Sequence, residues 1–163
     1  MRVFAPGTKK DLLPLLPKLP LLDLHKIQDQ ESFEQWFDEQ LDLVAQGIMI
    51  KNKGNSKVNP GYKWGHGTKI LNLYLREIVL NSRYFKDSDT RRLSFFLYVP
   101  IDSKIMDRMR RLGFKLPFRR IKEIRTKDQF MHVQQLLGGA AAKAKAPRIW
   151  FDYVWGEIES GEV

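Results

Sequence analysis

The sequence predicts a single, mostly α-helical domain of 163 residues. Apolar residues recur every three or four positions in the helical segments given below, which is the spacing of one face of an α-helix. Glycine, proline and capping residues separate these segments. The chain is also long enough to bury a core without disulfides or metals, and 43% of its residues are hydrophobic.

The first third predicts a proline-rich segment followed by one long helix. Residues 1–30 contain several prolines, so we expect an extended or kinked segment laid across the core. The apolar spacing predicts a helix over 32–46, which Ser32 caps with Gln35 as its capping-box partner. Residues 51–63 are basic and rich in Gly, Asn and Pro, which predicts a loop.

The middle of the chain predicts two more helices and one ambiguous run. Gly65-His66-Gly67 predicts a tight turn that feeds a helix over 68–82. Residues 81–92 read as a charged connection, and 93–99 are compatible with a short strand or with a buried helix. A further helix is expected over 103–112, with Asp102 at its N-cap.

The last third predicts two helices and a tail. Residues 114–120 form a basic loop, and Thr126 is expected to cap a helix over 127–137 that Gly138-Gly139 breaks. Pro147 is expected to start a final helix through 154, before a loose acidic tail over 156–163. We expect six aromatic side chains in the core, namely Trp36, Phe37, Phe95, Phe96, Trp150 and Phe151.

Charge and composition limit the function. The chain has 28 Lys and Arg against 19 Asp and Glu, a net charge of +9, and residues 51–130 alone carry +13. A basic middle between acidic ends favours a polyanionic partner such as nucleic acid. The absence of cysteine excludes disulfides, thiolate zinc sites, iron–sulfur clusters and cysteine nucleophiles, and it fits a cytoplasmic protein. Three scattered histidines do not suggest a metal site, and no apolar run reaches the length of a membrane span.

Two short motifs carry the chemistry. Gly65, Gly67 and Lys69 form a Gly-x-Gly-x-Lys pattern entering one helix, and Pro100 and Asp102 form a Pro-x-Asp pattern opening another that ends Arg-Leu-Gly. A glycine turn at a helix N-terminus lets unpaired backbone amides approach a phosphate.

Together these motifs resemble the helix–hairpin–helix DNA glycosylase superfamily over residues 64–113. The separation of 33 residues between Lys69 and Asp102 resembles the archaeal 8-oxoguanine DNA glycosylase branch. The resemblance implies a helix–hairpin–helix fold, a nucleophilic Lys69 and Asp102 as its catalytic partner. It further implies excision of a damaged or modified base from duplex DNA, with oxidised guanine as the first expectation, and cleavage of the resulting abasic site.

The chemistry requires a neutral lysine and a base pocket. An amine that attacks the sugar C1′ must lack its extra proton, so we expect the surroundings to lower the usual lysine pKa of about 10.4. An extruded base needs stacking partners, and the candidates are Trp64, Tyr62, Trp150 and Trp155. Candidate DNA contacts are Gly65, His66, Gly67, Lys63, Arg76, Arg110 and Arg111.

Two alternatives remain open at this stage. The same hairpin and basic residues suit a nucleic-acid-binding module without catalysis, and a basic face also suits a domain that binds an acidic protein. Under the glycosylase hypothesis we expect a cytoplasmic, nucleoid-associated monomer that needs no cofactor or metal.

Overall fold

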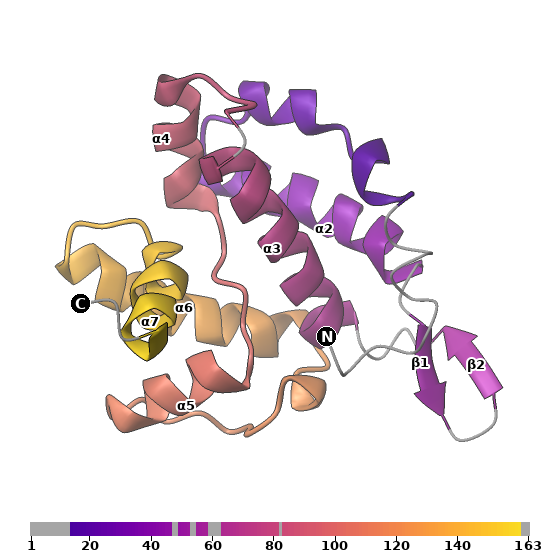
Figure 1. The fold of residues 1–163 in the computed structure, drawn as a ribbon, viewed down its shortest axis with the longest axis vertical. Coiled ribbons are helices and arrows are strands. Elements are labelled where there is room, and N and C mark those ends of the chain that lie inside the picture. Colours follow the sequence, from indigo (N-terminus) through magenta and orange to yellow (C-terminus); the bar gives the residue numbers. More distant parts are fainter. Residues whose placement is uncertain (1–13, 47–48, 53–54, 59–62, 82, 161–163) are drawn as a thin grey trace.

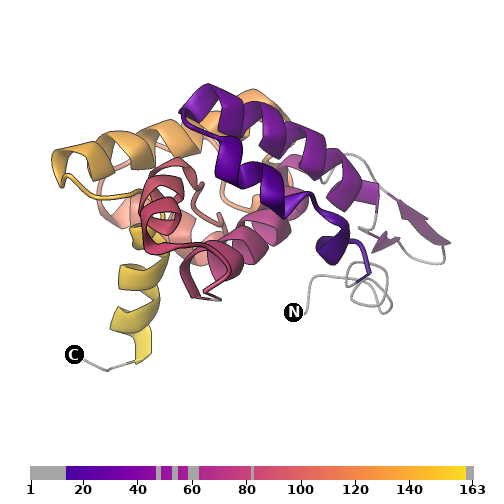
Figure 2. The ribbon, with the colours of Figure 1, turned by 90° about the horizontal axis from the view of Figure 1, so that it is seen from above.

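The structure, a computed structural model, describes residues 14–46, 49–52, 55–58, 63–81 and 83–160, and it is mostly helical (Figure 1). Two 3₁₀ helices, η1 (Leu16–Lys18) and η2 (Leu21–Lys26), precede α2 (Gln30–Gln46). A hairpin of β1 (Met49–Asn52) and β2 (Asn55–Val58) projects from the helical body in both views (Figures 1 and 2). The elements that follow are η4 (Lys63–Gly67), α3 (Thr68–Arg76), η5 (Glu77–Asn81), α4 (Asp87–Phe96), α5 (Ser103–Arg111), η6 (Ile121–Glu123), α6 (Lys127–Lys143) and α7 (Trp150–Ser160).

An aromatic cluster joins α2, α6 and the segment between α4 and α5. The ring of Tyr98 lies 5.0 Å from Phe37, 5.2 Å from Phe130 and 5.5 Å from Phe33, measured between centroids. All four side chains are at most 1% exposed. Large rings packed edge to face or tilted at these distances contribute both apolar burial and favourable quadrupole contacts. The cluster therefore fixes the position of the chain that leads into α5.

The segment 97–101 is extended and fully buried, so its backbone needs hydrogen bonds from elsewhere in the protein. The Gln134 amide donates to the Val99 carbonyl at 2.8 Å and accepts from the Val99 N–H at 3.0 Å. The Arg148 guanidinium donates to the carbonyls of Leu97 and Phe96 at 3.0 and 2.9 Å. These two side chains hold a strand-like segment in place without a neighbouring strand.

Several predicted elements of the first half are confirmed and others are corrected. The helix over 32–46 is present, but it starts two residues earlier, and the Asp29 carboxylate accepts the Ser32 N–H at 2.8 Å, so Ser32 is not its cap. The expected loop over 51–63 contains most of the β-hairpin. The proline-rich start was expected to be extended or kinked, and its described part forms two 3₁₀ helices, whereas residues 1–13 lie outside the described chain.

Corrections in the second half follow from tertiary packing. The charged connection ends early because α4 begins at Asp87. The run 93–99 is neither of the two expected forms, since its first half ends α4 and its second half is extended. Gly138-Gly139 does not break α6, which continues to Lys143. The tail is helical up to Ser160, and residues 161–163 are not described.

Capping predictions in this half hold. Asp102 caps α5, and Thr126 caps α6 in a capping box with Gln129. Two of the six aromatic side chains expected in the core are instead about half exposed, namely Phe95 and Trp150.

We expect Gln134→Leu to lower the free energy of unfolding by about 2–4 kcal/mol, because it leaves the buried N–H and carbonyl of Val99 without partners. The matched control is Gln135→Leu on the exposed side of the same helix, which should change stability by less than about 0.5 kcal/mol. Urea unfolding of both variants measures the difference. Equal stability of the two variants would contradict the role given to Gln134.

Candidate functional site

The structure brings Lys69 and Asp102 together from α3 and from the start of α5. The Lys69 ammonium donates to Asp102 Oδ2 at 3.1 Å, and both side chains are about 30% exposed. The other oxygen of the carboxylate, Oδ1, accepts the Ile105 N–H at 3.0 Å. Asp102 therefore caps its helix with one oxygen and pairs with Lys69 through the other.

Lys69 is held on a long continuous helix rather than after a turn. Lys63–Gly67 forms a π-helical turn that runs directly into α3, and Gly67 has helical angles of φ −61° and ψ −50°. The predicted tight turn at Gly65-His66-Gly67 is therefore wrong, and the described residues do not confirm a helix–hairpin–helix motif. All three residues are buried, so they offer no backbone surface to a phosphate in this conformation.

Gly65 has a packing role in place of the expected phosphate contact. A methyl group at this position would overlap the Ile121 carbonyl oxygen and lie 3.2 Å from the Ile124 carbonyl oxygen. Only glycine allows the η6 backbone to pack this closely against η4. This contact fixes the start of the helix that carries Lys69.

A second ion pair from α7 lies beside the first. Arg76, seven residues after Lys69 and on the same face of the helix, pairs with Asp152 of α7. Burial raises the pKa of the Asp152 carboxyl and the Arg76 charge opposes that rise. The nearby Asp102 carboxylate raises this pKa further, whereas the Lys69 ammonium lowers it. The two ion pairs are thus electrostatically coupled.

We call Lys69, Asp102, Arg76 and Asp152 the charge cluster. It contains two cations and two anions drawn from α3, α5 and α7, so its formal charge is zero. The Arg76 guanidinium also lies 5.4 Å from the centroid of the Tyr153 ring. Arg76 was predicted to contact DNA, but in this structure its guanidinium pairs with Asp152 and lies against the Tyr153 ring. Asp152 escaped the sequence analysis because its only signal is an acidic residue within an apolar helix.

His66 lies inside the protein next to the start of α3. The His66 residue is only 3% exposed. Burial lowers the pKa of His66 to about 4, and the positive charges of Lys69 and Arg125 act in the same direction. The imidazole is therefore neutral at pH 7, and it does not face a ligand as the predicted DNA contact would require.

The other predicted DNA contacts divide into paired and exposed groups. Lys63 pairs with Asp42 and lies 5.2 Å from the centroid of the Trp64 ring. Arg110 pairs with Asp107 and donates to the Phe118 carbonyl at 3.0 Å. Arg111 is exposed and forms no ion pair with any described residue. Of the cations predicted to contact DNA, Arg111 is thus the most accessible.

Neither of the two pockets described below joins a predicted stacking partner to Lys69. Trp64 packs against Phe130 with centroids 6.1 Å apart, and Tyr62 lies outside the described residues. Trp150 and Trp155 line an apolar pocket of about 170 Å³ between α7 and the end of α6. Neither Lys69 nor Asp102 lines this pocket.

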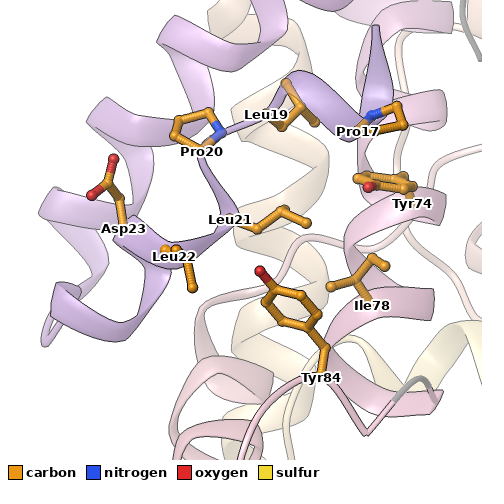
Figure 3. Close-up of a pocket in the computed structure, with 9 residues that line it drawn as sticks. All are labelled: Pro17, Leu19, Pro20, Leu21, Leu22, Asp23, Tyr74, Ile78 and Tyr84. Carbon is orange, nitrogen blue, oxygen red and sulfur yellow. The ribbon is translucent and has the colours of Figure 1, made fainter. Parts of the chain in front are cut away.

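A larger pocket of about 540 Å³ lies between η2 and α3, where Tyr74, Ile78 and Tyr84 surround Leu21 (Figure 3). Helical spacing places Tyr74 and Ile78 on the face of the helix opposite Lys69. This pocket is therefore separate from the charge cluster.

Asn72 is a further residue that sequence analysis did not identify as functional. It follows Lys69 by one turn of α3 and is 1% exposed. Its amide nitrogen and oxygen are both buried and have no hydrogen-bond partner among the described residues. A buried amide without partners is costly, and such groups are typical of functional sites and of sites that bind water.

Comparison with known proteins identifies no relative. No family model matches the chain, and neither a curated protein nor a solved structure does so. Within the described ranges, no group of three or more acidic or histidine side chains is arranged to bind a metal ion. No helix in the same ranges has the length and apolar character needed to cross a bilayer.

We expect acid to destabilise the protein through His66. The unfolded chain binds a proton at this residue below about pH 6.5, whereas the folded protein does so only below about pH 4. The free energy of unfolding should therefore fall by up to about 3 kcal/mol between these two pH values. Urea unfolding across this range, compared with His66→Gln, measures the contribution. An imidazole resonance of His66 that titrates near 6.5 would contradict it.

We expect Asn72→Leu to preserve or raise the free energy of unfolding, by up to about 2 kcal/mol. It removes a buried amide that has no partner and adds apolar surface to the core. Gln134→Leu is the matched comparison, because it replaces a buried amide whose bonds are satisfied. Urea unfolding should show a loss of stability for Gln134→Leu and no loss for Asn72→Leu. A loss of similar size in both variants would show that Asn72 bonds a buried water.

Proposed function

We propose that the protein is a DNA base-excision glycosylase with lyase activity, in which Lys69 is the nucleophile and Asp102 its partner. The observation that supports this proposal is the 3.1 Å contact between the Lys69 ammonium and the Asp102 carboxylate, at a partly exposed position. A nucleophile and a proton acceptor must lie within hydrogen-bond reach for this chemistry. The motif resemblance names the same two residues.

The proposed reaction begins with attack of the neutral Lys69 amine on the sugar C1′ of an extruded nucleotide. A bond forms between Nζ and C1′, the bond from C1′ to the base breaks, and the base leaves with that electron pair and takes up a proton. Opening of the sugar ring breaks the bond from C1′ to the ring oxygen, which takes up a proton as Nζ loses one, and gives an imine between Lys69 and C1′. Loss of a proton from C2′ then breaks the bond from C3′ to the 3′ phosphate, which leaves and cleaves the strand.

The amine must lose a proton before it attacks, and Asp102 is the acceptor within reach. A nucleotide that covers the pair would exclude water from it. Desolvation disfavours the two charged forms relative to the neutral pair, so substrate binding itself favours the proton transfer. The carboxylate also lies where it can stabilise positive charge that develops on the sugar.

The substrate class in the proposal is a damaged or modified base in duplex DNA. The branch resemblance makes oxidised guanine the first candidate. We propose that the protein acts on it as a monomer in the cytoplasm, where the nucleoid lies.

A second candidate is a nucleic-acid-binding module without catalysis. Two observations favour it. The Lys69 ammonium is occupied by its ion pair, and neither described pocket includes Lys69. This candidate predicts salt-sensitive DNA binding without any covalent adduct. A domain that binds an acidic protein would show no such binding near physiological salt.

Borohydride trapping tests the proposal. Borohydride reduces an imine to a stable amine, so the native protein should become covalently attached to duplex DNA that contains an abasic site. Lys69→Gln should give no adduct. Asp102→Asn keeps an oxygen that can cap α5 and should slow single-turnover trapping by about a hundredfold or more.

The control variant is Lys127→Gln, which removes a partly exposed lysine that pairs with Asp38 and should trap like the native protein. A panel of duplexes with single lesions, 8-oxoguanine first, then identifies the excised base. Adduct formation by Lys69→Gln at the native rate would contradict the assignment of the nucleophile. Tight DNA binding with no adduct on any substrate would reject the enzyme and support the second candidate, a nucleic-acid-binding module without catalysis.

A further inference from the structure

Positive charge is concentrated between α5 and α6. Residues 108–125 contain eight Lys or Arg and one acidic residue. The segment continues from the end of α5, along the lower edge of the molecule in Figure 1, to η6. Six of its cations have exposed side chains, and we call five of them, namely Arg111, Lys115, Arg119, Arg120 and Lys122, the basic strip. None of these five forms an ion pair with a described residue.

Apolar anchors alternate with these cations along the segment. Phe114, Leu116 and Ile121 are half-buried against the core, while Phe118 and Ile124 are buried. The residues between the anchors are the other four cations of the basic strip, which follow Arg111, together with Pro117 and Glu123. Because the anchors face inward, the cations are directed to the solvent side of the same stretch of chain.

Backbone hydrogen bonds hold this segment in a defined shape. The Phe114 N–H donates to the Met109 carbonyl at 3.0 Å and the Ile124 N–H to the Ile121 carbonyl at 3.1 Å. The single acid, Glu123, accepts the Arg119 N–H at 2.9 Å. The backbone amides of Arg119 and Arg120 lower the pKa of the Glu123 carboxyl, as do the charges of Arg120 and Lys122. Glu123 thus stabilises the local backbone between Arg119 and Glu123.

Both ends of the segment connect to the charge cluster. The helix before it, α5, is capped by Asp102, and η6 packs on Gly65, four residues before Lys69. The cluster has no net charge, so attraction for a polyanion must come from its surroundings. By contrast, α2 has five acidic residues and no Lys or Arg. The charge of the molecule is therefore segregated between different elements.

We infer that the basic strip binds the phosphate backbone of duplex DNA and replaces the buried Gly65–Gly67 turn as the backbone-contacting element. Cations carried on a backbone of fixed shape can neutralise successive phosphates with little loss of conformational entropy. The inference rests on the proposed function only for the identity of the polyanion as duplex DNA. The binding itself does not require catalysis.

The test compares two triple variants that remove the same charge. Arg119→Gln/Arg120→Gln/Lys122→Gln neutralises part of the basic strip, and Lys86→Gln/Arg91→Gln/Lys143→Gln neutralises three exposed cations elsewhere. Binding to an undamaged duplex of about 20 base pairs is measured at several salt concentrations. The strip variant should bind at least about tenfold more weakly near 0.1 M salt, with a log–log salt slope smaller by about two to three. The control should stay within about twofold of the native protein.

Equal weakening of both variants would show a general effect of net charge and would overturn the inference, as would native binding by the strip variant. Failure of the native protein to bind any duplex would also overturn it. Trapping on abasic DNA at saturating protein separates this result from the proposed function. If the strip variant binds DNA weakly and the native protein never forms an adduct, the basic strip is supported and the proposed enzyme is rejected. If the strip variant binds like the native protein and still forms the adduct, the basic strip is rejected and the proposed enzyme is supported.

Discussion

The geometry of the candidate site depends on one buried stretch of extended chain. Residues 97–101 cross the core without a strand beside them, so Gln134 and Arg148 supply the hydrogen bonds that a sheet would otherwise provide. The aromatic cluster around Tyr98 fixes the same segment from the other side. Asp102 follows immediately, and its carboxylate can reach Lys69 only because this segment ends where it does. The acid is thus positioned by the core rather than by a flexible loop.

Two electrostatic environments lie next to each other on this protein. The charge cluster is neutral overall and partly buried, which suits a site where a proton moves between an amine and an acid. The basic strip is exposed and strongly cationic, which suits long-range attraction of a polyanion. Under the proposed function, Lys69 would react with the sugar while the basic strip attracts the DNA backbone, so Lys69 would not have to do both.

Local signals in the sequence predicted the elements that local chemistry decides. The caps at Asp102 and Thr126 were predicted because a side chain three residues from its backbone partner determines them. The juxtaposition of Lys69 and Asp102 was predicted from motif resemblance, not from spacing. The turn at Gly65 was wrong because glycine serves there to admit a neighbouring backbone, which only tertiary structure reveals. Asp152 and Asn72 were missed for the same reason, since their meaning comes from burial beside other elements.

The alternation of sign within the charge cluster constrains how the sequence can vary. A single neutral substitution leaves three charges and an imbalance in a partly desolvated place, whereas a paired change at 76 and 152 keeps the sum at zero. Two paired changes are therefore better tolerated than a change at one position alone. One exchanges the arginine and the aspartate between α3 and α7, and the other replaces both by apolar side chains. In related chains, the residues at positions 76 and 152 should therefore change together. The residue at position 102 should vary far less, because its side chain also caps a helix.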